Sequence, residues 1–70
     1  MYGNFLGKKI KELRLEKKLS QRSLGDKLGV CNQTVSFWES GSREPDLDTL
    51  VKISDFFEVS TDYLLGKIEY

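Results

Sequence analysis

Four side chains that suit contacts with the edges of nucleic-acid bases recur at helical spacing in the middle of the chain. They are Asn32, Gln33, Ser36 and Phe37. Steps of three and four residues link them, which places them on one side of an α-helix. The amide groups of Asn and Gln can pair with N6 and N7 of adenine, and a phenyl ring can contact the methyl group of thymine. Thr34 lies to the side of this set, from where it could reach a phosphate or a base.

Few residues of this chain suit catalysis or metal binding. The sequence contains no His and one Cys, Cys31, which excludes the usual zinc sites, triads with a His base and an intrachain disulfide. Glu39 could act as a general acid or base only beside a nucleophile, a His or a metal. We expect no enzyme activity, no metal, no cofactor and no small-molecule ligand. A redox role for Cys31 is the alternative to its being a small, inert apolar residue.

Opposite charges are concentrated in the two halves of the chain. The 70 residues carry 11 basic and 11 acidic side chains. Residues 1–31 hold eight bases and three acids, a net charge of +5, and residues 32–70 hold three bases and eight acids, a net charge of −5. A basic half can attract a polyanion while the acidic half faces away. The alternative is two solvated faces of a globular domain.

The apolar spacing predicts short helices and no strands. A first helix is expected near residues 5–17, a second near 21–28 after the N-cap Ser20, and a third near 32–40. Asp46 and Ser60 are expected to cap a fourth and a fifth helix. The buried face of the fourth helix is predicted to consist of Leu47, Leu50, Val51, Ile53 and Phe57.

These elements predict a single domain over residues 1–70, with a core at 5–66 and a tail at 67–70. We expect no membrane-spanning segment, because no apolar run exceeds three residues. No secretory leader is visible at the N-terminus.

The second and third helices are predicted to meet at a sharp corner. Gly25, Gly29 and Val35 stand at offsets of zero, four and ten residues. A small residue at 25 would let the third helix pass close to the second, and Gly29 can adopt the positive φ of a tight turn. Apolar side chains fill the inside of the corner: Leu24, Leu28, Val30, Val35 and Trp38. The pattern predicts a helix-turn-helix with helix 32–40 in the recognition position, and the alternative is a generic helical hairpin.

The stretch from Leu19 to Gly66 resembles the phage repressor and Cro type of helix-turn-helix domain, the XRE family. The motifs that carry the resemblance are LSQ before the second helix, LGV at the turn, TVSFWESG through the third helix, EPDLDTL at the start of the fourth and VSTDYLLG at the end. When the first helix, KKIKELRLEKKLSQ, is included, the resemblance covers about 60 of the 70 residues.

This resemblance implies an all-α, compact, lambda-repressor-like fold of five helices. It also implies sequence-specific binding of double-stranded DNA, commonly by a dimer that represses transcription. Base contacts would then fall on Asn32, Gln33 and Phe37. Gln21 would clamp the DNA backbone and brace the recognition helix. Arg14 and Glu39 would form a partly buried ion pair.

Besides Gln21 and Thr34, the candidates for phosphate contacts follow the third helix: Ser40, Ser42 and Arg43. Ordinary loop polarity is the alternative for Ser42 and Arg43. Family members often carry several Lys or Arg here, whereas this loop has one Arg followed by Glu44 and Asp46. We therefore expect weaker affinity and a shallower salt dependence than in a strongly basic relative.

Cys31 stands where the family often has Ser or Thr as a helix cap. Because Cys caps poorly, Asn32 is an alternative N-cap, and its amide would then be partly engaged by the backbone. For Phe37 the alternative to a base contact is shielding of the corner.

The C-terminal end is predicted to contact a second copy of the chain. More apolar surface gathers there than a small core can bury, in Tyr63, Leu64, Leu65, Ile68 and Tyr70. We assign Leu64 to the core, and Leu65, Ile68 and Tyr70 to a homodimer interface. Two copies joined there could hold their recognition helices about one DNA turn, roughly 34 Å, apart. The alternative is a fifth helix that only covers the core.

Two functions from different classes remain open. The first is a cytoplasmic, nucleoid-associated transcriptional regulator, a dimeric repressor that reads an inverted-repeat operator through helix 32–40. The alternative is a protein-interaction module on the same fold, such as an antitoxin or a regulator's partner, with weak or no specific DNA binding. The zero net charge and the acidic loop after the third helix support the alternative.

Overall fold

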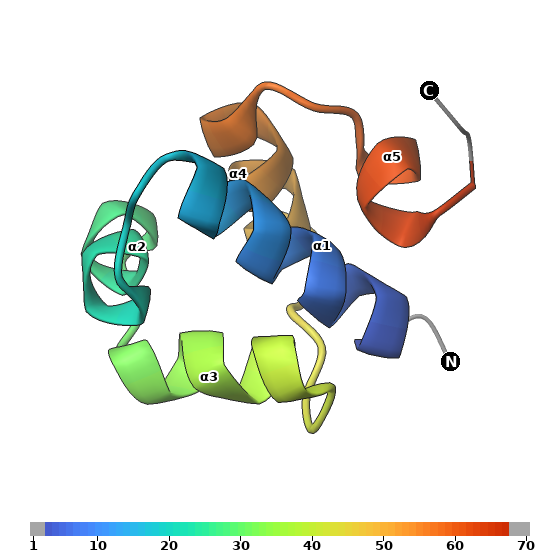
Figure 1. The fold of residues 1–70 in the computed structure, drawn as a ribbon. Coiled ribbons are helices and arrows are strands. Elements are labelled where there is room, and N and C mark those ends of the chain that lie inside the picture. Colours follow the sequence, from blue (N-terminus) through green and yellow to red (C-terminus); the bar gives the residue numbers. More distant parts are fainter. Residues whose placement is uncertain (1–2, 68–70) are drawn as a thin grey trace.

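The computed structural model describes residues 3–67. These residues form five α-helices and no strand: α1 (Gly3–Glu16), α2 (Gln21–Leu28), α3 (Asn32–Ser40), α4 (Leu47–Phe57) and α5 (Thr61–Leu65) (Figure 1). The predicted all-α class is confirmed. The predicted bounds of α2 and α3 are also confirmed, and α1 begins and ends slightly earlier than the expected 5–17.

Local capping signals account for most of the helix ends. Three helices begin at side chains that accept a backbone N–H at 2.9–3.0 Å, namely Ser20, Asp46 and Ser60. Such caps satisfy donors that have no partner inside the first turn of a helix. The turn between α2 and α3 passes through Gly29 at a φ of 78°, as predicted. This left-handed conformation costs glycine little, so the chain can reverse within few residues.

One apolar core joins all five helices. Its buried side chains are Leu6, Ile10, Leu13, Leu24, Leu28, Val35, Trp38, Leu50, Ile53, Phe57 and Leu64. Burial of this surface is the main favourable contribution to folding. Each helix contributes at least one of these residues, so the helices are held in a defined mutual arrangement.

The predicted buried face of α4 was wrong at two positions. The exposed fractions are 80% for Leu47 and 51% for Val51, whereas Ser54 is buried. Successive residues are rotated by about 100° around a helix. The stripe of α4 that faces the core therefore follows Leu50, Ile53, Ser54 and Phe57, and Leu47 and Val51 lie beside it.

Helix α1 crosses α3 at very short range. A Cβ atom placed on Gly7 of α1 would collide with the carbonyl oxygen atoms of Trp38 and Glu39. Glycine at position 7 thus permits the approach of the two helix backbones. Residue spacing along the chain did not indicate this requirement.

Gly25 permits the close approach of α2 to the start of α3. A Cβ atom there would lie 2.6 Å from the carbonyl oxygen of Val30. The same turn is closed by the N–H of Val30, which donates to the carbonyl oxygen of Gly25 at 2.8 Å. The small residue therefore accommodates the backbone of the turn and of Cys31, the N-cap of α3, at the point where α3 comes closest to Gly25.

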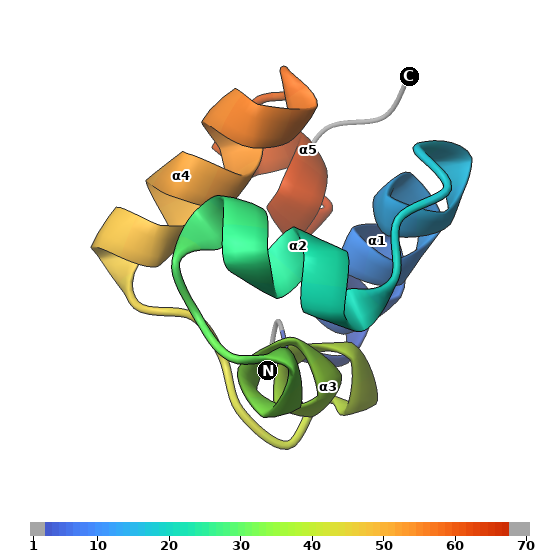
Figure 2. The same ribbon diagram turned by 90° about the vertical axis from the view of Figure 1, so that its left-hand side faces the viewer.

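Helix α3 lies at the lower edge of the molecule in both ribbon views, with α1 and α2 packed against its inner side (Figures 1 and 2). Its other side faces away from the rest of the fold. Within residues 3–67, no helix has the length and apolar character needed to cross a membrane.

Candidate nucleic-acid interface

The outer side of α3 consists of the four residues predicted to contact bases. Asn32, Gln33, Ser36 and Phe37 are all exposed. Val35 and Trp38, with exposed fractions of 0% and 3%, anchor the opposite side in the core. The amphipathic pattern of α3 thus turns the polar amides and the hydroxyl group outward while the core holds the helix in place.

The start of α3 resolves the capping alternative. Cys31 occupies the N-cap position and makes no side-chain capping hydrogen bond, and Asn32 is the first helical residue. The alternative that Asn32 caps the helix is therefore wrong. Thr34 is half-buried, and its hydroxyl lies 3.2 Å from Cys31 Sγ. This hydrogen bond, together with the backbone N–H of Thr34, lowers the pKa of the Cys31 thiol.

A buried carboxylate fixes the far end of α3. Glu39 Oε2 accepts a hydrogen bond from Arg14 Nε at 2.6 Å, and Glu39 Oε1 accepts one from Arg14 Nη2 at 3.0 Å. The side chains of Arg14 and Glu39 are 10% and 5% exposed. Arg14 Nη1 also donates to the carbonyl oxygen of Leu19 at 2.8 Å. This two-bond pairing of a planar guanidinium with a carboxylate specifies orientation as well as contact.

Gln21 completes this network from the first turn of α2. Its Nε2 donates to Glu39 Oε1 at 3.1 Å. Three helices therefore meet at one carboxylate, with Arg14 from α1, Gln21 from α2 and Glu39 from α3. The network fixes the orientation of α3 relative to the N-terminus of α2, the end of a helix that favours anions.

The segment after α3 brings the other phosphate candidates together. Ser40 Oγ donates to the carbonyl oxygen of Phe37 at 3.1 Å and lies 2.9 Å from Ser42 Oγ. The guanidinium carbon of Arg43 lies 5.1 Å from the centre of the Phe37 ring. All four side chains are exposed. The predicted base contact Phe37 and the predicted phosphate contact Arg43 thus touch each other, which sequence spacing did not indicate.

The outer surface of α3 carries no acidic side chain. Glu39 is the only ionisable residue of Asn32–Ser40, and its carboxylate is paired inside the fold. Four acids lie on α4, on α5 and on the connection between them, at Asp48, Asp55, Glu58 and Asp62, and two more, Glu44 and Asp46, lie in the segment between α3 and α4. Since a phosphate backbone is repelled by nearby carboxylates, the side formed by α3 suits a polyanion better than the side formed by α4 and α5.

The predicted self-association surface is only partly described. Leu64 is fully buried, as predicted, and Leu65 is half-buried against the same core. Ile68 and Tyr70 lie outside the described residues.

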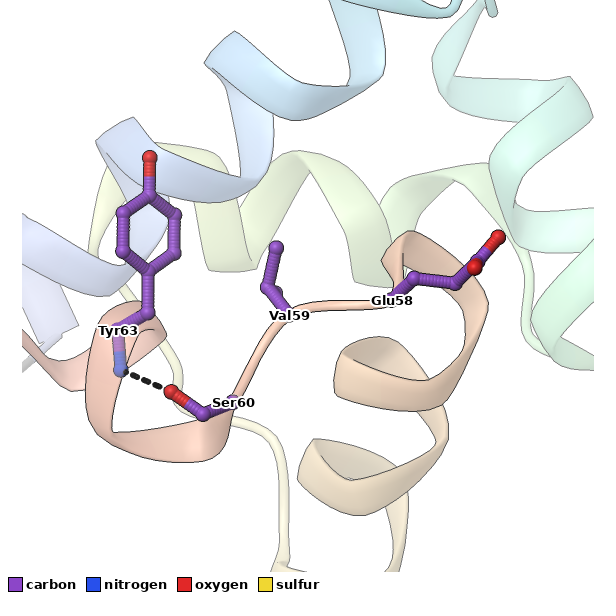
Figure 3. Close-up of a pocket in the computed structure, with 4 residues that line it drawn as sticks. All are labelled: Glu58, Val59, Ser60 and Tyr63. Atoms are coloured by element: carbon purple, nitrogen blue, oxygen red, sulfur yellow. Dashed lines mark hydrogen bonds between the residues drawn. The ribbon is translucent and has the colours of Figure 1, made fainter. Parts of the chain in front are cut away.

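A surface hollow of about 260 Å³ lies close to this region, where α4 leads into α5 (Figure 3). Its lining residues are Glu58, Val59, Ser60 and Tyr63. Ser60 Oγ accepts the N–H of Tyr63 there at 3.0 Å. With Glu58 as its charged lining residue, this hollow is unsuited to phosphate groups.

Comparison with known proteins identifies the family. The sequence profile of the helix-turn-helix family matches residues 10–64. The chain is 47% identical over 64 residues to the HTH-type transcriptional regulator ImmR of Bacillus subtilis, covering 91% of this chain and 50% of ImmR. It thus spans about half the length of curated relatives that it matches.

Several solved structures share the fold, and two of them do so over almost the whole of their own chains. The P22 c2 repressor in complex with a synthetic operator superposes with a TM-score of 0.85 at 34% identity, over 91% of this chain and 97% of the repressor chain. The restriction-modification controller protein C.AhdI from Aeromonas hydrophila superposes with a TM-score of 0.76 at 28% identity, over 90% of this chain and 94% of its own. This chain belongs to the helix-turn-helix family of the phage-repressor, or XRE, type.

Proposed function

We propose that this domain binds double-stranded DNA with α3 in the major groove and that it regulates transcription. The main support for this proposal is the distribution of side chains between the outer and inner sides of α3. Its outer side presents two amides, a hydroxyl and a phenyl ring, while its single carboxylate is paired internally. A helix of this kind can approach a polyanion and hydrogen bond to base edges. The similarity to a repressor solved on its operator supports this assignment.

The base contacts are assigned to the outer residues of α3. Gln33 and Asn32 lie in the first turn, the part of a recognition helix that enters the groove, and their amides suit adenine. Ser36 lies one turn further along and can donate to or accept from a base. Phe37 follows Ser36 on the same outer side, and its ring lies next to the guanidinium group of Arg43.

The phosphate contacts surround this surface. Gln21 and Thr34 lie at the N-terminal ends of α2 and α3, where backbone N–H groups favour anions. Ser40, Ser42 and Arg43 lie at the opposite end of α3. Contacts at both ends of the recognition helix would fix its register on the duplex without reading sequence.

The assembly that we propose is a homodimer on an inverted-repeat operator, acting in the cytoplasm as a repressor. Leu65 is the described residue that we assign to the interface, with Ile68 and Tyr70 beyond it. A two-fold dimer places identical helices at equal half-sites, about one helical turn apart. Relatives described as repressors, such as the C2 protein of Salmonella phage P22, support the direction of regulation.

Selection of bound duplexes from a random DNA pool at moderate salt tests the proposal. Enrichment of an inverted repeat with half-sites about 10–11 base pairs apart would support a dimeric sequence reader. Enrichment of a single half-site would support sequence reading and contradict the dimer. If duplexes are retained without enrichment of any sequence, and are released at higher salt, sequence-specific binding is contradicted.

A protein-interaction module is the second candidate. Two apolar side chains of α4, Leu47 and Val51, have exposed fractions of 80% and 51%, and the same helix carries the acids Asp48 and Asp55. A protein partner could cover such a surface. The test is to measure the affinity of the isolated domain for a duplex at near-physiological salt. Binding with the same affinity in the wild type and in Leu47→Ser would contradict protein interaction as the main function.

A further inference from the structure

Phe37 holds the segment after α3 through its backbone. Its carbonyl oxygen accepts the N–H of Ser42 at 3.0 Å, the N–H of Arg43 at 3.3 Å and the hydroxyl of Ser40 at 3.1 Å. The N–H of Gly41, whose φ is 81°, is shared between the carbonyl oxygens of Phe37 and Trp38, and its distance to the Trp38 oxygen is 3.1 Å. Four donors thus converge on one carbonyl group, so the path of residues 40–43 is set by the position of Phe37.

The side chain of Phe37 contacts the same segment. The guanidinium carbon of Arg43 lies 5.1 Å from the centre of the ring, within the range of a cation–aromatic contact. A guanidinium group stacked on a ring keeps the donors along its edge available to other groups. Phe37 is 40% exposed, so the pair lies at the surface of the fold.

The charges around Arg43 make its placement important. It is the only basic residue among residues 41–46, and that segment also holds Glu44 and Asp46. Asp46 is directed to its own helix, because its Oδ1 accepts the N–H of Thr49 at 2.9 Å. The C-terminal end of α3 favours a cation through its carbonyl groups. A single guanidinium among acids can attract phosphate effectively only if it is held toward the duplex.

We propose that Phe37 is a positioning residue that holds Arg43 against the DNA backbone beside the recognition helix. The inference rests on the proposed DNA binding and deepens it. Arg43 covers one face of the ring, so the contribution of Phe37 is expressed through Arg43 and not through a thymine methyl group. Phe37 and Arg43 then act as one unit that strengthens binding to all sequences equally.

A double-mutant cycle tests this coupling. Dissociation constants are measured by fluorescence anisotropy for the wild type, Phe37→Leu, Arg43→Gln and the double variant, on duplexes with and without thymine at the candidate contact positions. We expect Phe37→Leu to weaken binding about two- to fivefold, which is the size of an exposed cation–aromatic contact. In the Arg43→Gln background the same change should have little effect.

Conservative variants distinguish a contact between the Phe37 ring and the Arg43 guanidinium group from an effect of side-chain volume alone. Phe37→Tyr retains the ring and should bind as the wild type does, whereas Arg43→Lys retains the charge and loses the planar group, so it should bind more weakly. Phe5→Leu is the matched control. Phe5 is a similarly exposed Phe, 43% against 40%, and its ring lies 5.7 Å from Lys9 Nζ on α1. Its replacement should leave affinity unchanged.

Three results would overturn the inference. Additive losses in the cycle would show that the two residues act independently. A loss in Phe37→Leu confined to duplexes that carry thymine would make Phe37 a base reader. A wild type that binds no duplex would overturn both this inference and the proposed function, whereas the first two results leave DNA binding intact. Thermal melting of each variant shows whether the fold is retained.

Discussion

Arg14 Nε lies 2.6 Å from Glu39 Oε2, and this ion pair joins the last turn of α1 to the last turn of α3. Gln21 from α2 contacts the same carboxylate. A polar network inside the fold therefore orients the recognition helix. The outer side chains of the helix take no part in this network. Such a network specifies geometry more than it adds stability, because both charges had to leave water.

Removal of one partner of this pair should destabilise the fold strongly. Glu39→Gln leaves the guanidinium of Arg14 without its countercharge, at a cost of about 3–5 kcal/mol in the free energy of unfolding. Urea denaturation measures the loss. The double variant Arg14→Met/Glu39→Met removes both charges and should regain part of it. A single variant that unfolds at the wild-type urea concentration would contradict this role.

Gln33 and Arg43 should affect DNA binding in different ways. Gln33→Ala removes an amide from the first turn of α3 and should change the preferred base at one position, by about 1–3 kcal/mol of discrimination. Arg43→Ala should weaken binding to all sequences about equally and reduce the salt slope by about 1. Binding to a panel of single-base variants of the selected site, at several salt concentrations, distinguishes the two. Equal losses on every sequence for both variants would refute the assignment of Gln33.

Gly7→Ala should loosen the crossing of α1 and α3. The new methyl group would meet the carbonyl oxygens of Trp38 and Glu39, which belong to backbone and cannot rotate away. We expect a loss of about 1–3 kcal/mol in the free energy of unfolding, despite the higher helix propensity of alanine. Chemical denaturation measures it, with Lys8→Ala as the control at an exposed neighbouring position. A Gly7→Ala protein more stable than the wild type would show that the helices separate at no cost.

The cap of α4 should make stability depend on pH. Hydrogen bonds from Thr49 lower the pKa of Asp46 below its ordinary value of 3.8. A group whose pKa is lowered by folding contributes its full stabilisation above the unfolded pKa and loses it as the pH falls through the folded pKa. The contribution of Asp46 should therefore be present at neutral pH and disappear in acid below 3.8.

Asp46→Asn isolates this effect from the other carboxylates. Asparagine is a good N-cap that does not titrate in this range. The stability of the wild type should fall relative to Asp46→Asn as the pH is lowered from about 6 to about 2.5. Thermal unfolding of both proteins across that range measures the difference. Parallel curves would mean that the carboxylate of Asp46 contributes nothing as a cap.

Local signals in the sequence determined where three of the helices begin and where the turn between α2 and α3 lies. Ser20, Asp46 and Ser60 precede helices that start at the following residue, and Gly29 makes the turn that leads to α3. A cap or a positive φ depends on atoms within a few residues, so it can be predicted without knowledge of the fold. The alternation of buried and outward positions in α3 is equally local, and it correctly placed Gln33 outside and Trp38 inside.

Contacts between distant segments were decided only by the tertiary structure. The exposure of Leu47 and Val51 and the close approach of α1 to α3 at Gly7 depend on how rigid helices cross. The crossing geometry follows from the packing of the whole core, in which every helix takes part. Residue spacing therefore predicted which side of α3 faces outward, and the packing of the helices decided how closely α1 approaches its inner side.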